Sequence, residues 1–194
     1  MSEQGEHNAR LFLSRVRDHY VDQLLLFIAD QRRNSIRGES EVKIELEPGS
    51  PVFRSLACAD FVRNDGEPEI VEFEPERALG FDPIDSTLGG ALLRIVALRW
   101  DDVVIDHDGS FEPEVALGNW FDRWFDPDDR RHRPSADLQD VVHSVIVEPG
   151  RITIDFGSAQ PEAFWEMLNL IEKSGATRVR IDASRSDQPA PTPA

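Results

Sequence analysis

Residues 141–156, VVHSVIVEPGRITIDF, decide the fold of this chain. The runs 141–147 and 151–156 are rich in valine and isoleucine, which are typical of β-strands. Between them, Glu148-Pro149-Gly150 has the composition of a tight turn. Two such runs around a short turn favour an antiparallel hairpin.

A helix and a third strand follow this hairpin. Residues 160–174 place an apolar stripe at helical spacing, with a proline in the first turn and a glycine directly after the last. Residues 177–182 alternate apolar and charged side chains, as a half-buried strand does. The last third of the chain therefore predicts a β-β-α-β unit.

Upstream of this unit the sequence begins with a long helix. Residues 8–34 carry apolar side chains on i, i+3 and i+4 spacing, at Phe12, Val16, Tyr20, Leu24, Phe27 and Ile28. A stripe of this size requires cover, so we expect the helix to pack on a sheet or on a second protomer.

Four further strands and a short helix are expected between these parts. The strands are predicted at 41–47, 69–74, 91–99 and 103–107, and the helix at 114–125. In the first strand Val42, Ile44 and Leu46 would face the core, and Glu41, Lys43, Glu45 and Glu47 would face solvent.

Together these elements predict an α+β fold with a long N-terminal helix on a mostly antiparallel sheet, ending in the β-β-α-β unit. We expect a single domain at 8–183. Residues 1–7 and the Pro/Ala-rich tail 184–194 are expected to be disordered.

The negative charge is confined to the middle of the chain. The formal net charge is −16; residues 39–90 hold 13 acids against 4 basic residues, and residues 91–129 hold 10 against 3. Both ends are nearly neutral. Such a distribution creates a directional electrostatic field that would attract a basic partner. The same negative charge opposes direct binding to nucleic acid.

Composition also indicates the compartment. The longest apolar run is residues 24–29, far short of a membrane span, and the N-terminus lacks the apolar region of a secretory signal. The single cysteine, Cys58, fits a reducing compartment and lies in a small apolar setting typical of a buried thiol. We therefore expect a cytoplasmic protein without membrane contact, and 19 arginines against 2 lysines indicate a bacterial-like, GC-rich composition.

No motif in the sequence predicts a catalytic residue, a metal site or a cofactor. The stretch Asp106-His107-Asp108-Gly109 suggests a calcium loop, but Val104 and Val115 would then stand at the two positions that require carboxylates. A small hydrolase or metal-dependent enzyme using Asp106, His107, Asp108 and His143 stays an alternative. It requires a deep pocket that brings these groups together.

Residues 119–129, NWFDRWFDPDD, set large aromatic side chains among carboxylates. Trp120 and Trp124 would share one helical face, and Phe121 and Phe125 an adjacent one. The pairs are typical either of a core stripe or of anchors in a binding surface.

These patterns favour a non-catalytic interaction module that binds a basic protein through an acidic face, in the manner of an inhibitor or an immunity-type protein. If the strands at 41–47 and 69–74 are neighbours, their glutamates share that face. A second alternative is a self-associating structural protein with a homodimer seam at 8–34. The expected partner-binding residues are Glu41, Glu45, Glu47, Glu72, Glu74, Trp120, Asp122, Trp124, Asp126, Asp128 and Asp129.

Overall fold

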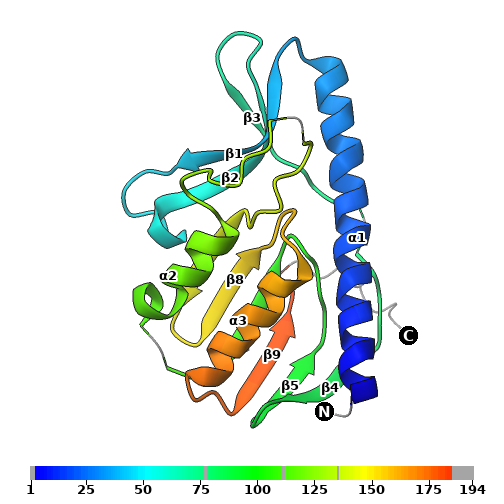
Figure 1. The fold of residues 1–194 in the computed structure, drawn as a ribbon, viewed down its shortest axis with the longest axis vertical. Helices are drawn as coiled ribbons and strands as arrows, with labels where there is room; N and C mark the ends of the chain where they lie inside the picture. The colour runs from blue at the N-terminus through cyan, green and yellow to red at the C-terminus, as the bar shows by residue number, and fades with distance from the viewer. Residues whose placement is uncertain (1–2, 77, 111, 135, 185–194) are drawn as a thin grey trace, which may run out of the picture.

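The computed structural model describes residues 3–76, 78–110, 112–134 and 136–184, which form the expected α+β fold (Figure 1). The helices are α1 (Glu3–Asn34), α2 (Pro113–Trp124) and α3 (Pro161–Lys173). The strands are β1 (Gly38–Glu45), β2 (Leu56–Arg63), β3 (Glu69–Val71), β4 (Ile84–Leu88), β5 (Ala91–Ile95), β6 (Val103–His107), β7 (Ser144–Glu148), β8 (Arg151–Asp155) and β9 (Arg178–Asp182), and a 3-10 turn, η1 (Phe53–Ser55), precedes β2.

The larger sheet has six strands in the order β4-β5-β9-β6-β8-β7. Its β7–β8 hairpin, followed by α3 and β9, is the predicted β-β-α-β unit. The hairpin turn is as short as the sequence indicates, since Glu148 pairs with Arg151 and Gly150 adopts φ +74°. Only glycine reaches this region at little cost, so Gly150 sets the register of the hairpin.

The strands predicted at 91–99 and 103–107 are present as β5 and β6. They follow one another in the sequence, but β9 lies between them in the sheet. It pairs parallel with β5 and antiparallel with β6. The last strand of the described residues thus lies near the centre of the sheet, where its apolar side chains gain burial on the helix-covered face.

The smaller sheet has three strands in the order β1-β2-β3. The predicted strands at 41–47 and 69–74 are therefore not neighbours, because β2 separates them. Strand β3 also ends at Val71, so Glu72 and Glu74 lie beyond it. Strand β2 was not predicted.

Helix α1 begins at Glu3, before the expected start at residue 8, and runs along both sheets (Figure 1). Its predicted stripe faces inward: Val16, Tyr20, Leu24 and Ile28 are buried, and Phe12 and Phe27 pack against the same core. The apolar stripe through which residues 8–34 would form a homodimer is thus buried within one chain.

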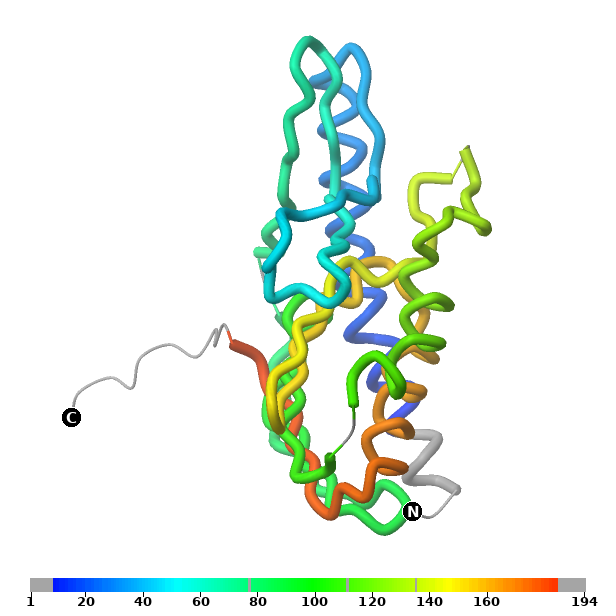
Figure 2. The backbone as a smooth tube through the Cα atoms, turned by 90° about the vertical axis from the view of Figure 1, so that its left-hand side faces the viewer, coloured from blue at the N-terminus to red at the C-terminus, as the bar shows by residue number. Residues whose placement is uncertain are grey.

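Figure 2 views the molecule from the side, with the helices lying on one side of the six-stranded sheet. Strand β5 reflects this arrangement, since Ala91, Leu93 and Ile95 are buried whereas Leu92 and Arg94 are exposed. The opposite face of the sheet has no helix among the described residues. None of the described helices combines the length and apolar character needed to cross a membrane.

Candidate functional site

The structure divides the expected partner-binding residues into two groups. The exposed ones are Glu45, Glu47, Glu72, Glu74, Asp122, Asp128 and Asp129. The buried ones are Glu41, Trp120, Trp124 and Asp126. A buried side chain does not present itself to a partner, so the second group has structural roles.

The aromatic residues of α2 belong to the core. Phe121 and Phe125 are fully buried with their rings stacked at 4.6 Å. Trp120 donates its indole N–H to the carbonyl of Ala163 at 2.9 Å, and Trp124 donates to Glu166 Oε2 at 2.8 Å. Both bonds fasten α2 to α3, so the core interpretation of this segment is confirmed.

Asp126 holds the turn that follows α2. It adopts φ +56°, and its carboxylate accepts hydrogen bonds from the backbone N–H groups of Arg130 at 3.2 Å and Arg131 at 2.8 Å. Its side chain is therefore engaged within the chain.

Strand β1 departs from the predicted alternation at Glu41. Glu41 is 6% exposed and points inward, whereas Val42 and Ile44 are only partly buried. Glu41 also adopts φ +53°, which is uncommon for a residue other than glycine. At this one position, polar contacts on the inner side of the sheet therefore outweigh the alternation of the strand.

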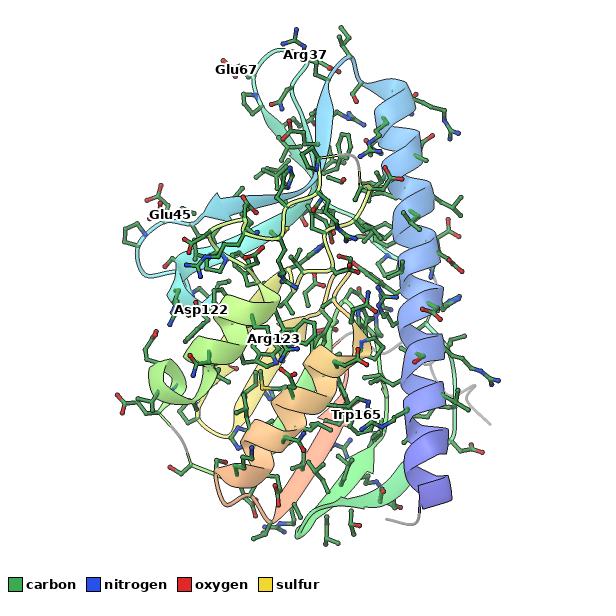
Figure 3. All side chains as sticks on the ribbon, viewed as in Figure 1. Arg37, Glu45, Glu67, Asp122, Arg123 and Trp165 are labelled. Atoms are coloured by element: carbon green, nitrogen blue, oxygen red, sulfur yellow. The ribbon has the colours of Figure 1, made fainter. Side chains whose placement is uncertain are left out.

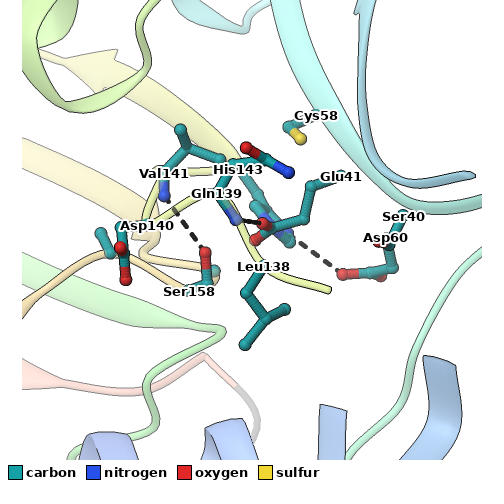
Figure 4. Close-up of polar contacts among 12 residues, drawn as sticks. Ser40, Glu41, Cys58, Asp60, Leu138, Gln139, Asp140, Val141, His143 and Ser158 are labelled. Atoms are coloured by element: carbon teal, nitrogen blue, oxygen red, sulfur yellow. Dashed lines mark hydrogen bonds and ion pairs between the residues drawn. The ribbon is translucent and has the colours of Figure 1, made fainter. Parts of the chain in front are cut away.

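The inward face of β1 and β2 surrounds His143, which lies just before β7 (Figure 4). His143 Nε2 is 2.9 Å from Glu41 Oε1, and Nδ1 is 3.1 Å from Asp60 Oδ1. Asp155 Oδ2, at the end of β8, lies 3.9 Å from Nδ1. We call Glu41, Asp60, His143 and Asp155 the histidine cluster.

The histidine cluster lies where the two sheets meet. The backbone N–H of Cys58 in β2 donates to the carbonyl of His143 at 2.8 Å, and His143 N–H donates to the carbonyl of Asp155 at 2.9 Å. Residue 143 thereby joins β2 of one sheet to β8 of the other. Gly157, at φ +49°, leaves the space that the imidazole fills.

The ionisable groups of the histidine cluster shift one another's pKa. Burial lowers the pKa of His143, but the carboxylates of Asp60 and Glu41 raise it well above its usual value. Burial raises the pKa of Asp155 to about 7, with Asp60 adding to the rise and His143 opposing it. Hence His143 is the imidazolium at neutral pH, and its charge compensates part of the buried negative charge.

Two residues beside the histidine cluster are affected by it. Burial raises the pKa of Cys58 to about 12, so this thiol is neutral and buried, as the sequence suggested. Partial burial of its carboxyl group and the nearby negative charge of Asp60 raise the pKa of Glu72.

The histidine cluster performs a structural task. The side chains of Glu41 and His143 are 0% and 2% exposed, so a substrate does not reach them. Within the described part of the chain, no three His, Cys, Asp or Glu side chains are arranged to hold a metal ion. Sequence reasoning missed this cluster, although Asp60 and His143 each interrupt an apolar run and thus carried a signal.

A second feature is a set of exposed carboxylates from the C-terminal end of β1 and from α2 and the segment that follows it. We call this set the acidic edge: Glu45, Glu47, Asp122, Asp128 and Asp129. Arg54 in η1 bonds Asp122 of this edge at 2.7 Å and also Glu114 at 3.2 Å. Figure 3 places Glu45 and Asp122 on the same side of the molecule.

The negative charges of the acidic edge are only partly paired with basic side chains. Lys43 pairs with Asp129, and Arg130 pairs with Asp128 at 2.6 Å. Among the described residues, no cation pairs with Glu45 or Glu47, and both side chains are exposed. The acidic edge therefore keeps a net negative charge.

The residues of the enzyme alternative do not converge. Asp106 pairs across the sheet with Arg151 at one end of β8, whereas His143 is bonded to Asp155 at the other end. His132 is exposed in the segment that follows α2. Asp106, His107 and Asp108 instead line a groove on the uncovered face of the sheet.

Comparison of the chain with protein-family models, curated proteins and solved structures found no match.

Proposed function

We propose that this protein is a non-catalytic binding module that engages a basic protein through the acidic edge, in the manner of an inhibitor or immunity-type protein. The observation that carries the proposal is the exposure of Glu45 and Glu47 without a paired cation among the described residues. A basic partner would supply that missing charge.

The anchoring of β1 supports this proposal. Glu41 is bonded to His143, and Lys43 Nζ bonds both Asp129 and the carbonyl of Asp126. The strand that carries Glu45 is therefore fixed to the rest of the protein on both sides. A rigid surface loses less conformational entropy when it binds than a mobile one does.

The overall charge supports the same proposal. At a net charge of −16, the protein attracts basic molecules over a distance of about one Debye length, or about 8 Å at physiological salt. Such attraction raises association rates and selects among partners. Proteins that handle nucleic acid present basic clefts, which makes them fitting partners for this surface.

Affinity capture from source-cell lysate at low salt tests the proposal. The bait is the full chain, compared with the double variant Glu45→Gln/Glu47→Gln and a control, Glu67→Gln/Glu148→Gln, which removes the same charge from exposed positions outside the acidic edge. A basic protein retained by the wild type and the control, but not by the acidic-edge variant, supports the proposal. Equal retention by all three chains contradicts it.

A further inference from the structure

The uncovered face of the six-stranded sheet carries a groove of about 590 Å³. It crosses β4, β5, β9 and β6 and ends at Gly150 in the β7–β8 turn. Side chains at the outward-facing positions of these strands line the groove. They include three arginines, although the protein as a whole carries a net charge of −16.

Three arginines line the groove on two parallel strands. The register places Arg94 of β5 beside Arg180 of β9, and Leu92 beside Arg178. Like charges on neighbouring strands are unfavourable when no counter-charge lies between them. The side chains of Arg94 and Arg178 are 54% and 78% exposed, so their guanidinium groups are accessible from the groove.

The carboxylates of the groove are largely engaged elsewhere. Asp106 bonds Arg151 at 2.7 Å. Asp108 accepts the N–H groups of Thr177 and Arg178 at 2.7 and 2.9 Å and the Thr177 hydroxyl at 2.6 Å, and these bonds hold its pKa well below its usual range. These two acids therefore offer little further bonding capacity to the arginines.

The remaining ion pairs of the groove differ in strength. Arg180 bonds Asp182 at 2.6 Å, which is a close contact. Arg94 is 3.4 Å from Asp85, and Arg178 is 3.6 Å from Asp108. Both distances exceed the roughly 2.7–2.9 Å of a charge-assisted hydrogen bond. Arg94 and Arg178 thus keep N–H donors for a ligand.

An exposed leucine, Leu92, lies beside Arg94 and Arg178. Leu92 is two residues before Arg94 on the same strand and directly beside Arg178 on the next. It is 63% exposed, which leaves its side chain available to an apolar group. Guanidinium donors beside an exposed leucine match a ligand that is negatively charged at one end and apolar at the other.

We propose that this groove binds an amphipathic anion, with a phosphate or carboxylate group held by Arg94 and Arg178 and an apolar body resting on Leu92. The planar guanidinium group matches both anions, since each offers paired oxygen acceptors. This site is distinct from the acidic edge, and it does not depend on the proposed function.

Isothermal titration calorimetry on the full chain tests the groove with three probes: octyl phosphate, octanoate and inorganic phosphate. Salt at about 0.15 M limits the repulsion that the net charge imposes on anions. Saturable 1:1 binding of octyl phosphate, octanoate or both supports the proposal and identifies the anionic group. Binding of neither at concentrations on the order of 1 mM overturns it. Inorganic phosphate that binds as tightly as the alkyl probes overturns the role of Leu92.

Variants locate the binding. The double variant Arg94→Gln/Arg178→Gln should weaken the alkyl anion at least about tenfold, and Leu92→Asn should weaken it several-fold. The matched control is Arg123→Gln, because Arg123 is exposed on α2 and pairs with Glu166 on the other face of the sheet. All these side chains are exposed, and circular dichroism checks that each variant is folded. An affinity that is unchanged in the double variant overturns the assignment.

Discussion

His143 Nε2 lies 2.9 Å from Glu41 Oε1, and this contact joins the segment before β7 to β1 of the smaller sheet. Both side chains are buried, so the pair is shielded from water. Its partners extend to Asp60 and Asp155, which places one imidazolium among three carboxyl groups. The position of β1, and with it the acidic edge, depends on this buried charge.

Removing the imidazole should destabilise the protein strongly. We expect His143→Ala to lower the free energy of unfolding by about 3–5 kcal/mol, because Glu41 and Asp60 would remain buried without a cation. Urea unfolding followed by circular dichroism measures the change. The control His132→Ala removes an exposed histidine and should stay within about 0.5 kcal/mol of wild type. Equal stability of the two variants would show that His143 is not a structural cation.

The histidine cluster also predicts the direction of pH dependence. The pKa of Asp155 is about 7 in the folded protein and about 3.9 in an unfolded chain, so the folded state holds the extra proton between these values. Stability should therefore fall as pH rises from about 4 to 7, by at most about 1.4 kcal/mol per unit. His143 acts in the same direction above about pH 6.5, since its pKa is raised on folding.

Asp155→Asn isolates the contribution of the carboxyl group, because asparagine keeps an acceptor for the N–H of Gly157. Chemical unfolding at several pH values compares its slope with that of the wild type. We expect a flatter curve between pH 4 and 7 in the variant. Parallel curves for the two proteins would refute a proton on Asp155 in this range.

Gly157 should not tolerate a side chain. A Cβ at this position would meet the His143 ring, and the residue adopts φ +49°. We expect Gly157→Ala to cost at least about 1–3 kcal/mol in thermal or urea unfolding. The matched control is Gly66→Ala, where no described atom lies within 4 Å of the added Cβ and wild-type stability is expected. A neutral effect at residue 157 would contradict the packing of His143.

Local patterns of sequence predicted most of the elements but not their neighbours. The helices α1 and α3 and the β7–β8 hairpin follow from periodicity and turn residues, which act over short distances. Strand β2 was missed because Cys58 to Val62 are all buried, so its sequence has no alternation. The position of β9 between β5 and β6 depends on long-range pairing, which periodicity does not encode.

The burial of Glu41 shows why the candidate site was harder to predict. Alternation alone assigned Glu41 to solvent and Val42 to the core. The buried partners of Glu41, His143 and the backbone N–H of Gln139, lie about 100 positions later in the sequence, so only the folded chain reveals them. By contrast, the exposure of Glu45 and Glu47 agrees with the simple alternation.

The central claim is that a basic protein binds the acidic edge through Glu45 and Glu47. The most direct measurement is stopped-flow association of the purified partner with wild type, Glu45→Gln/Glu47→Gln and Glu67→Gln/Glu148→Gln over a range of salt concentrations. We predict a rate that falls steeply with salt for the wild type and the control, and a slower rate with a shallower salt dependence for the acidic-edge variant. Identical rates and salt dependences for all three proteins would contradict the account.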